Sequence, residues 1–141
     1  MGLSASMFRA MLKGHVWLYS RSGGRLGSMR GSILLLTTNG RKTGREWTVP
    51  LMGLDHGDGY LVAASAGGDP RHPAWYLNLQ AHPEVAVERN GEQREMTART
   101  ATPEERPALW DRFLAASKGF AKYEQRTTRE IPVVILEPRA G

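Results

Sequence analysis

The alternation of apolar and polar residues along the chain predicts a mostly antiparallel β-protein. SILLLTT at 32–38 predicts a buried strand, and EWTVPLMGL at 46–54 predicts a second one. Pro50 marks an edge, a bulge or a ligand-facing point of the second strand, because proline cannot donate a hydrogen bond to a β-ladder. DHGDG at 55–59 is typical of a tight hairpin turn that leads into a strand at 60–66. We therefore expect three antiparallel strands in succession.

The clearest hairpin signal lies at 84–100. Valines alternate there with charged residues, and Asn90-Gly91 supplies the positive φ angles that a two-residue turn needs. IPVVILEP at 131–138 predicts the last buried strand.

Helical spacing of apolar residues appears near the start, the middle and the end of the chain. Residues 6–19 predict an amphipathic helix, and 74–82 predict a short helix that begins after one proline and ends before another. TPEE at 102–105 is typical of a capping box. The helix that follows has an apolar stripe made of Leu109, Trp110, Phe113 and Leu114. Residues 118–130 predict a looser, partly helical stretch.

These elements predict an α+β domain. About six mostly antiparallel strands with flanking helices form most simply a small closed or split β-barrel with the helices packed outside. A doubly wound parallel sheet is disfavoured, because hairpins stand where βα turns would have to recur. The length of 141 residues fits one domain. We expect residues 1–30 to form a helix and connector, and residues 31–141 to form the barrel.

The positive charge is concentrated in the first third of the chain. The net charge is +5, yet residues 1–50 carry eight Lys and Arg against one acid, Glu46, while the other 91 residues carry eleven against thirteen. Such asymmetry indicates an anionic partner, namely nucleic acid, a membrane surface or a multiply charged small molecule. The alternative is a solvated basic face that only aids solubility.

Several classes of site are disfavoured by composition. The chain has no cysteine, so redox chemistry requires a bound cofactor. The four histidines form no i, i+3 or i, i+4 pair, so we expect no metal site. No apolar run has the length of a signal peptide or membrane span, which predicts a cytoplasmic protein. The helix at 6–19 either covers the barrel as core, which we favour, or lies on the inner face of an anionic membrane.

The turn between the first two predicted strands has the parts of an anion site. In NGRKTG at 39–44, two glycines let backbone N–H groups turn toward a ligand, and Thr43 offers a hydroxyl. Arg41, Lys42 and Arg45 add charge. The motif matches neither of the glycine-rich nucleotide fingerprints. The alternative is an ordinary solvated turn.

A second candidate segment is ASAGGDPRHPAWYLNL at 64–79. Gly67 and Gly68 follow a strand end, and the absence of side chains there lets a flat ring or a phosphate approach the backbone. The alternative is a loop that only needs positive φ angles, with Trp75 and Leu79 as core residues.

Taken together, these motifs resemble the deazaflavin-dependent nitroreductase family. ILLLTTNGRKTGREWTVPL, YLVAASAGGDPRHPAWYLNLQAHPEVAVERNGE, TARTATPEERPALWDRF and REIPVVILEP follow one another in the order and spacing typical of that family, over about 32–138. The family consists of class A reductases, chiefly actinobacterial, that use the reduced deazaflavin coenzyme F420. The resemblance implies a split β-barrel related to flavin-binding pyridoxamine-phosphate-oxidase-like proteins.

The resemblance also implies a set of site residues. The coenzyme's phosphate and polyglutamate tail are expected at Arg41, Lys42, Thr43 and Arg45. The groove for the deazaflavin is expected along Thr48, Pro50 and Met52, with backbone approach at Ala64, Ser65, Ala66, Gly67 and Gly68 and a wall at Trp75 and Asn78. A proton for the reduced substrate is expected from Ser65, Tyr123 or a water.

Three departures from the family pattern limit what the resemblance implies. Ala66 stands where many relatives carry lysine, and Trp47 stands where a basic residue is frequent. Ser117 and Phe120 stand where the nitroimidazole-activating member has tyrosines, and only Tyr123 matches. Binding of F420 is therefore better supported than nitroimidazole activation.

We accordingly expect an F420H2-dependent oxidoreductase that transfers a hydride to an activated alkene, a quinone or a nitro compound. The alternatives are an FMN-dependent oxidoreductase and a non-catalytic protein that binds F420 or a flavin. Nucleic-acid binding is disfavoured, because Trp47 is the one aromatic residue beside the basic turn. The oligomeric state stays open.

Overall fold

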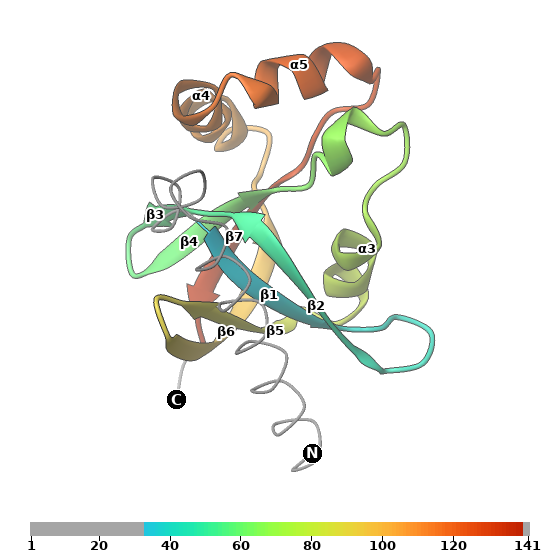
Figure 1. The fold of residues 1–141 in the computed structure, drawn as a ribbon, viewed down its shortest axis with the longest axis vertical. Helices are drawn as coiled ribbons and strands as arrows, with labels where there is room; N and C mark the ends of the chain where they lie inside the picture. The colour runs from blue at the N-terminus through green and yellow to red at the C-terminus, as the bar shows by residue number, and fades with distance from the viewer. Residues whose placement is uncertain (1–32, 140–141) are drawn as a thin grey trace, which may run out of the picture.

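The fold is a single curled antiparallel sheet flanked by helices (Figure 1). The computed structural model describes residues 33–139, so the helix expected at 6–19 and its connector lie outside the described residues. Within that range the strands are β1 Ile33–Asn39, β2 Glu46–Met52, β3 Leu54–His56, β4 Gly59–Ala63, β5 Glu84–Arg89, β6 Glu92–Thr100 and β7 Val133–Pro138. The helical elements are η2 Ala66–Gly68, α3 Ala74–Ala81, α4 Arg106–Ala116 and α5 Gly119–Arg126.

The order of the strands explains why the sheet curls. Neighbours follow the order β2-β1-β5-β6-β7-β4-β3, and every pair is antiparallel. β2 and β3 thus lie at opposite edges although Gly53 alone separates them in sequence. A sheet whose two edges are joined by one residue has to bend round on itself, as in a split barrel.

The expectation of three successive antiparallel strands is therefore wrong in one respect. The predicted strand 46–54 is broken at Gly53, where the chain leaves β1 and begins to pair with β4 as β3. A Cβ atom on Gly53 would collide with the side chain of Leu34, so any larger residue at this crossing point would force that buried leucine to shift. Of the three alternatives left open for Pro50, the structure shows an edge, since β2 is an edge strand of the sheet.

Local signals predicted two other features correctly. Asn90 and Gly91 have φ angles of 53° and 82° and join β5 to β6 as a two-residue hairpin. Thr102 and Glu105 form a reciprocal capping box, since each backbone N–H donates to the other's side-chain oxygen, at 2.9 Å from Thr102 and 3.2 Å from Glu105. The regular helix α4 begins directly after this box.

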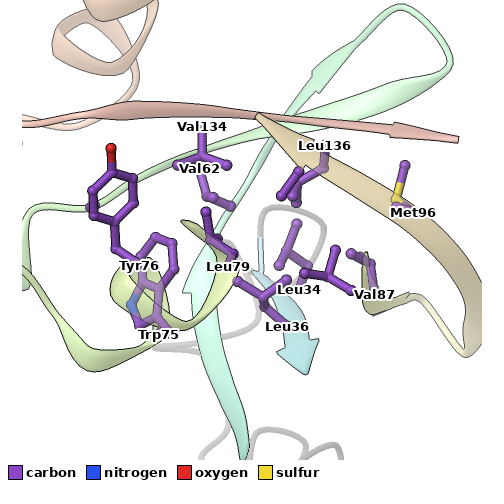
Figure 2. Packing of buried hydrophobic residues seen from close by; sticks show 13 residues of the cluster. Leu34, Leu36, Val62, Trp75, Tyr76, Leu79, Val87, Met96, Val134 and Leu136 are labelled. Atoms are coloured by element: carbon purple, nitrogen blue, oxygen red, sulfur yellow. The ribbon is translucent and has the colours of Figure 1, made fainter. Parts of the chain in front are cut away.

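Two apolar clusters lie on opposite faces of the sheet. The first packs the sheet against α3 and is shown in Figure 2, with Trp75 and Tyr76 at one end and Met96 at the other. The second packs the sheet against α4 and α5 and contains Phe113 and Phe120. Successive residues of β4 and β7 alternate between the two clusters, because side chains of a strand point to opposite faces.

The helices position two parts of the chain that matter for the site. α3 packs against β1 on the side from which the β1–β2 turn extends (Figure 1). α5 packs against η2, the short helical turn that follows β4. The turn at 40–45 therefore lies beside α3, and the segment at 64–73 packs against α5.

Candidate functional site

The basic turn between β1 and β2 has a fixed backbone. The N–H of Gly40 donates to the carbonyl of Arg45 at 2.7 Å, and the N–H of Gly44 donates to the carbonyl of Gly40 at 2.8 Å. Gly44 has a φ of 74°, which favours glycine. The N–H of Arg45 donates to the hydroxyl oxygen of Thr43 at 3.2 Å. Because this hydroxyl accepts within the turn, its own proton stays free to donate to a ligand.

The turn is fastened to α3 through Asn78. The side-chain oxygen of Asn78 accepts the backbone N–H of Arg41 at 3.1 Å and a guanidinium N–H of the same residue at 3.3 Å. The amide nitrogen of Asn78 donates to the hydroxyl of Thr38 at 3.3 Å. Asn78 is a buried polar residue, so these bonds also satisfy groups that would otherwise be costly to bury. The structure thus brings together two predicted site residues 37 positions apart.

A first cavity of about 480 Å³ lies between this turn, β2 and α3. Its wall contains both apolar and basic side chains. It is lined by Gly40, Arg41, Lys42, Thr43, Trp47, Val49, Ala74, Trp75 and Asn78. Trp47 is 54% exposed and is the large hydrophobic side chain that stands out from the surface of the described chain.

A second cavity of about 670 Å³ adjoins the first. It is lined by Arg41, Ala66, Asp69, Pro70, Arg71, His72, Pro73, Ala74, Leu77 and Arg129. The two cavities share Arg41 and Ala74 in their walls. Each has the size of a typical cofactor or ligand site.

Three cations of these walls lack acidic partners. Within residues 33–139, Arg41, Lys42 and Arg129 belong to no ion pair, nor does Arg45, which lies on the turn but in neither wall. Arg71 of the second cavity, in contrast, pairs with Asp69 at 3.7 Å. Cations outside any ion pair create a positive potential that attracts anionic ligands. The donors present are therefore suited to phosphate and carboxylate groups.

Arg129 lines the second cavity and was not predicted from the sequence. Its guanidinium donates to the backbone carbonyls of Ala64 at 3.1 Å, Ser65 at 2.9 Å and Asp69 at 2.9 Å. It also donates to Nδ1 of His72 at 3.1 Å. One side chain thus holds the whole segment between β4 and α3. No local motif marks this arginine, because its partners lie 57 to 65 residues away.

His72 lies between Arg129 and Tyr76. Its ring centre is 5.0 Å from that of Tyr76. Burial lowers the pKa of His72 below 6.5, and the positive charge of Arg129 lowers this pKa further. His72 is therefore held in the neutral form, in which Nδ1 can accept the hydrogen bond from Arg129.

The predicted groove residues of β2 face away from the first cavity. Side chains alternate along a strand, so Thr48, Pro50 and Met52 lie on the face opposite Trp47 and Val49. The hydroxyl of Thr48 is hydrogen-bonded to that of Thr37 at 2.6 Å, and Met52 packs against the second apolar cluster. The cofactor role of these three residues stays a prediction.

The glycine segment is closely packed against α5. A Cβ atom on Gly68 would lie 2.7 Å from Cβ of Arg126 and 2.9 Å from the carbonyl oxygen of Tyr123. Gly68 thus allows the helix to approach, which agrees with the alternative of a structural glycine. Ala64 is buried and Gly67 is exposed, whereas Ser65 is half-buried.

Tyr123 is half-buried on α5 and packs edge-on against Phe120 at 5.9 Å between ring centres. Of the residues predicted to supply the proton, neither Ser65 nor Tyr123 lines the two cavities described above. Their catalytic roles stay predictions.

Within residues 33–139, no group of three or more His, Asp or Glu side chains is arranged to hold a metal ion. No helix in the same range is both long enough and apolar enough to cross a membrane.

Comparison with known proteins gives the family. Residues 11–138 match the family described as F420H2-dependent quinone reductase. The chain belongs to this family. An F420H2-dependent quinone reductase of Mycobacterium tuberculosis is 36% identical over 135 residues, which are 92% of this chain and 91% of that protein.

Solved structures agree with the family and the fold. One described as the F420H2-dependent reductase FDR-A is 41% identical, with a TM-score of 0.69 over 75% of this chain and 94% of that one. A protein described as a pyridoxamine 5′-phosphate oxidase of Listeria innocua is 10% identical, with a TM-score of 0.55 over 87% of this chain and 94% of that one. This second likeness concerns the fold alone. The split-barrel fold and the family's dependence on F420, both expected from the resemblance, are confirmed.

The residues present fit the coenzyme that the family uses. A deazaflavin has a flat aromatic ring, a phosphate and a chain of carboxylates. The first cavity offers the aromatic side chains of Trp47 and Trp75 for the ring, and both cavities offer cations without acidic partners for the anionic groups.

Proposed function

We propose that this protein is an oxidoreductase that transfers a hydride from F420H2 to a quinone. The observation that carries the proposal is the pair of adjoining cavities that share Arg41 and Ala74. They combine aromatic walls with cations that lack acidic partners, as a planar, polyanionic coenzyme requires. Membership of the F420H2-dependent quinone reductase family supports both the coenzyme and the quinone.

The chain's own residues bind and orient the coenzyme. Trp75 and Trp47 contact its ring system or the adjoining chain, and Arg41, Lys42 and Thr43 bind its phosphate and carboxylates through charge-assisted hydrogen bonds. Asn78 fixes the turn that carries these groups. The reduced coenzyme supplies the hydride from C5 of its ring, and the protein contributes orientation and a site from which water is excluded.

A quinone that accepts a hydride also requires a proton. We propose Ser65, Tyr123 or a water as its source. Both side chains are half-buried; Tyr123 lies on α5, and Ser65 directly precedes η2, against which α5 packs.

F420 is favoured over FMN by the number of cations. FMN carries one phosphate, whereas the deazaflavin adds several carboxylates. Within residues 33–139, Arg41, Lys42 and Arg129 of these walls and Arg45 of the adjoining turn lack acidic partners. The single phosphate of FMN would pair with only part of this positive charge, whereas the polyanionic tail of F420 complements it.

The test is a parallel titration of the apoprotein with oxidised F420 and with FMN, followed by tryptophan fluorescence. Two of the four tryptophans, Trp47 and Trp75, line the first cavity, so a bound ring should quench them. We expect saturable quenching by F420 at lower concentration than by FMN. Tighter binding of FMN would indicate that FMN, not F420, is the cofactor. If neither ligand quenched the fluorescence, the protein would have a non-catalytic or unrelated binding role.

Contact with a membrane surface through residues 6–19 is a separate proposal that rests on the sequence alone. A cytoplasmic location is likewise proposed from the sequence alone. Sedimentation of the full chain with anionic and with neutral vesicles tests the membrane contact. Pelleting with anionic vesicles that salt reverses would support the contact. Recovery of all the protein in the supernatant would exclude it.

A further inference from the structure

The chain after β4 has an unusual backbone conformation. Ser65 has φ −79° and ψ −33°, in the right-handed helical region, and Ala66 follows with a φ of 47°, in the left-handed region. A positive φ is uncommon for a residue with a Cβ atom. A right-handed residue followed by a left-handed one forms a nest, in which three successive N–H groups converge on a common point that suits an anion.

The three N–H groups of this nest are available. Over the described range, the N–H groups of Ala64, Gly68 and Asp69 donate to the carbonyls of Pro132, Ser65 and Ala66. Those of Ser65, Ala66 and Gly67 donate to no acceptor in the same range. Ala66 lines the second cavity, and Ser65 and Gly67 are its neighbours in sequence, so the nest lies beside a space large enough for a ligand group.

Arg129 determines the direction of two of these donors. Its guanidinium binds the carbonyl oxygens of Ala64 and Ser65. In a trans peptide the carbonyl and the following N–H point in opposite directions within one rigid plane, and no cis peptide occurs in the described chain. Fixing the two carbonyls toward Arg129 therefore fixes the N–H groups of Ser65 and Ala66 away from it.

A second bond reinforces this arrangement. The carbonyl of Ser65 also accepts the N–H of Gly68 at 2.9 Å, which closes the short turn η2. Arg129 further binds the carbonyl of Asp69 and Nδ1 of His72, at the far end of the segment. The planar guanidinium spans acceptors that a single ammonium group could not reach together.

We propose that Arg129 is a positioning residue that shapes the turn at Ser65–Gly67 into a backbone nest for the phosphate of the coenzyme. This inference rests on the proposed function. The resemblance already implies backbone approach at Ser65, Ala66 and Gly67. The inference adds the residue that orients their N–H groups, at a position where Ala66 supplies no cation.

The experiment compares three ligands on Arg129→Lys. The ligands are F420, the same molecule without its glutamates, and the ribityl deazaflavin without its phosphate. Lysine keeps the charge but cannot hold the four acceptors at once. We expect the dissociation constants of both phosphate-bearing ligands to rise at least about tenfold, and that of the phosphate-free ligand to change less than about twofold. An equal change for all three ligands, or no change, would overturn the proposal.

Arg106→Lys is the matched control. Arg106 also donates twice to a backbone carbonyl, that of Ile131 at 3.0 and 2.8 Å, but it lines neither cavity. We expect this variant to lose thermal stability comparable to that lost in Arg129→Lys, with unchanged binding of all three ligands. A loss of phosphate-dependent affinity in Arg106→Lys would contradict a specific role for Arg129.

The wild-type protein provides a measurement that does not depend on the folding of a variant. In ¹⁵N-resolved NMR titrations, the amide signals of Ser65, Ala66 and Gly67 should shift with both phosphate-bearing ligands and stay in place with the phosphate-free one. Equal shifts with all three ligands would overturn the nest while leaving coenzyme binding intact. Failure of the wild type to bind any of the three would overturn both this inference and the proposed function.

Discussion

The amide oxygen of Asn78 binds Arg41 twice, accepting its backbone N–H at 3.1 Å and its guanidinium at 3.3 Å. A basic turn is thereby fixed to α3, and the guanidinium is held at the boundary between the two cavities. Without this bond, Arg41 would retain the freedom of an exposed side chain, and ordering it on binding would cost free energy.

Asn78→Ala should therefore affect binding and stability together. It removes the acceptor for Arg41 and leaves the hydroxyl of Thr38 without its donor. We expect a loss of about 1–3 kcal/mol in the free energy of unfolding and about tenfold weaker binding of F420. Calorimetry measures the free energy of unfolding, and the fluorescence titration measures the affinity for F420. Gln80→Ala, on the same helix but outside both cavities, is the control. Wild-type affinity in Asn78→Ala would show that the fixed turn is not needed.

Replacing the exposed cations of the turn tests the binding of the anionic tail. We expect Lys42→Ala with Arg45→Ala to weaken F420 by about 2–3 kcal/mol, because each lost charge-assisted bond contributes on that scale. Binding of FMN should change less, and the difference should shrink as salt is raised. Arg112→Ala with Arg139→Ala removes two cations that line neither cavity and serves as the control. Equal losses in the two double variants would indicate only a general charge effect.

Trp47 allows binding to be separated from stability. Because it is 54% exposed, Trp47→Ala should change the free energy of unfolding by less than about 0.5 kcal/mol. Loss of a stacking surface should weaken F420 by about 0.5–1.5 kcal/mol and reduce the amplitude of quenching. Trp47→Phe should restore most of the affinity. If the Trp47→Ala variant binds F420 as tightly as the wild type, Trp47 does not contact the coenzyme.

The lowered pKa of His72 predicts how the free energy of unfolding depends on pH. Its pKa in the folded protein lies below the unfolded value near 6.5, so the unfolded state binds more protons between the two values. The contribution of neutral His72 to the free energy of unfolding is fully present above about pH 6.5. It is lost as the pH falls through the lower pKa of the folded state. The charged groups facing the ring include Arg129, which opposes its protonation.

The comparison is with His72→Gln, which can accept the bond from Arg129 but does not titrate. We expect the melting temperature of the wild type to fall more than that of this variant between pH 7 and pH 5. Parallel curves for the two proteins would contradict the assignment of this pH dependence to His72.

Features set by neighbouring residues were predictable from the sequence. The Asn90-Gly91 turn and the Thr102–Glu105 capping box depend on conformational preferences and hydrogen bonds within a few residues. The basic turn was predicted as a candidate anion site for the same reason, since its glycines, hydroxyl and cations are contiguous, and its binding role stays a prediction.

Features set by distant residues were not predictable in this way. The break at Gly53 arises from contact with Leu34, which lies on another strand. Arg129 acts on a segment about sixty residues earlier, and nothing beside it in the chain indicates this. Alternation along β2 showed which residues share a face, but only the packing of α3 determines that Trp47 and Val49 line the first cavity.

The most direct test of the central claim is hydride transfer itself. Under nitrogen, the wild-type protein is mixed with F420H2 and menadione, and the return of oxidised coenzyme absorbance is followed, with cyclohexenone and a nitroimidazole in parallel. We predict saturable turnover with menadione that falls in Asn78→Ala and not in Gln80→Ala. Oxidation of F420H2 no faster than without protein, while F420 still binds, would contradict the claim and leave a coenzyme-binding protein without quinone reductase activity.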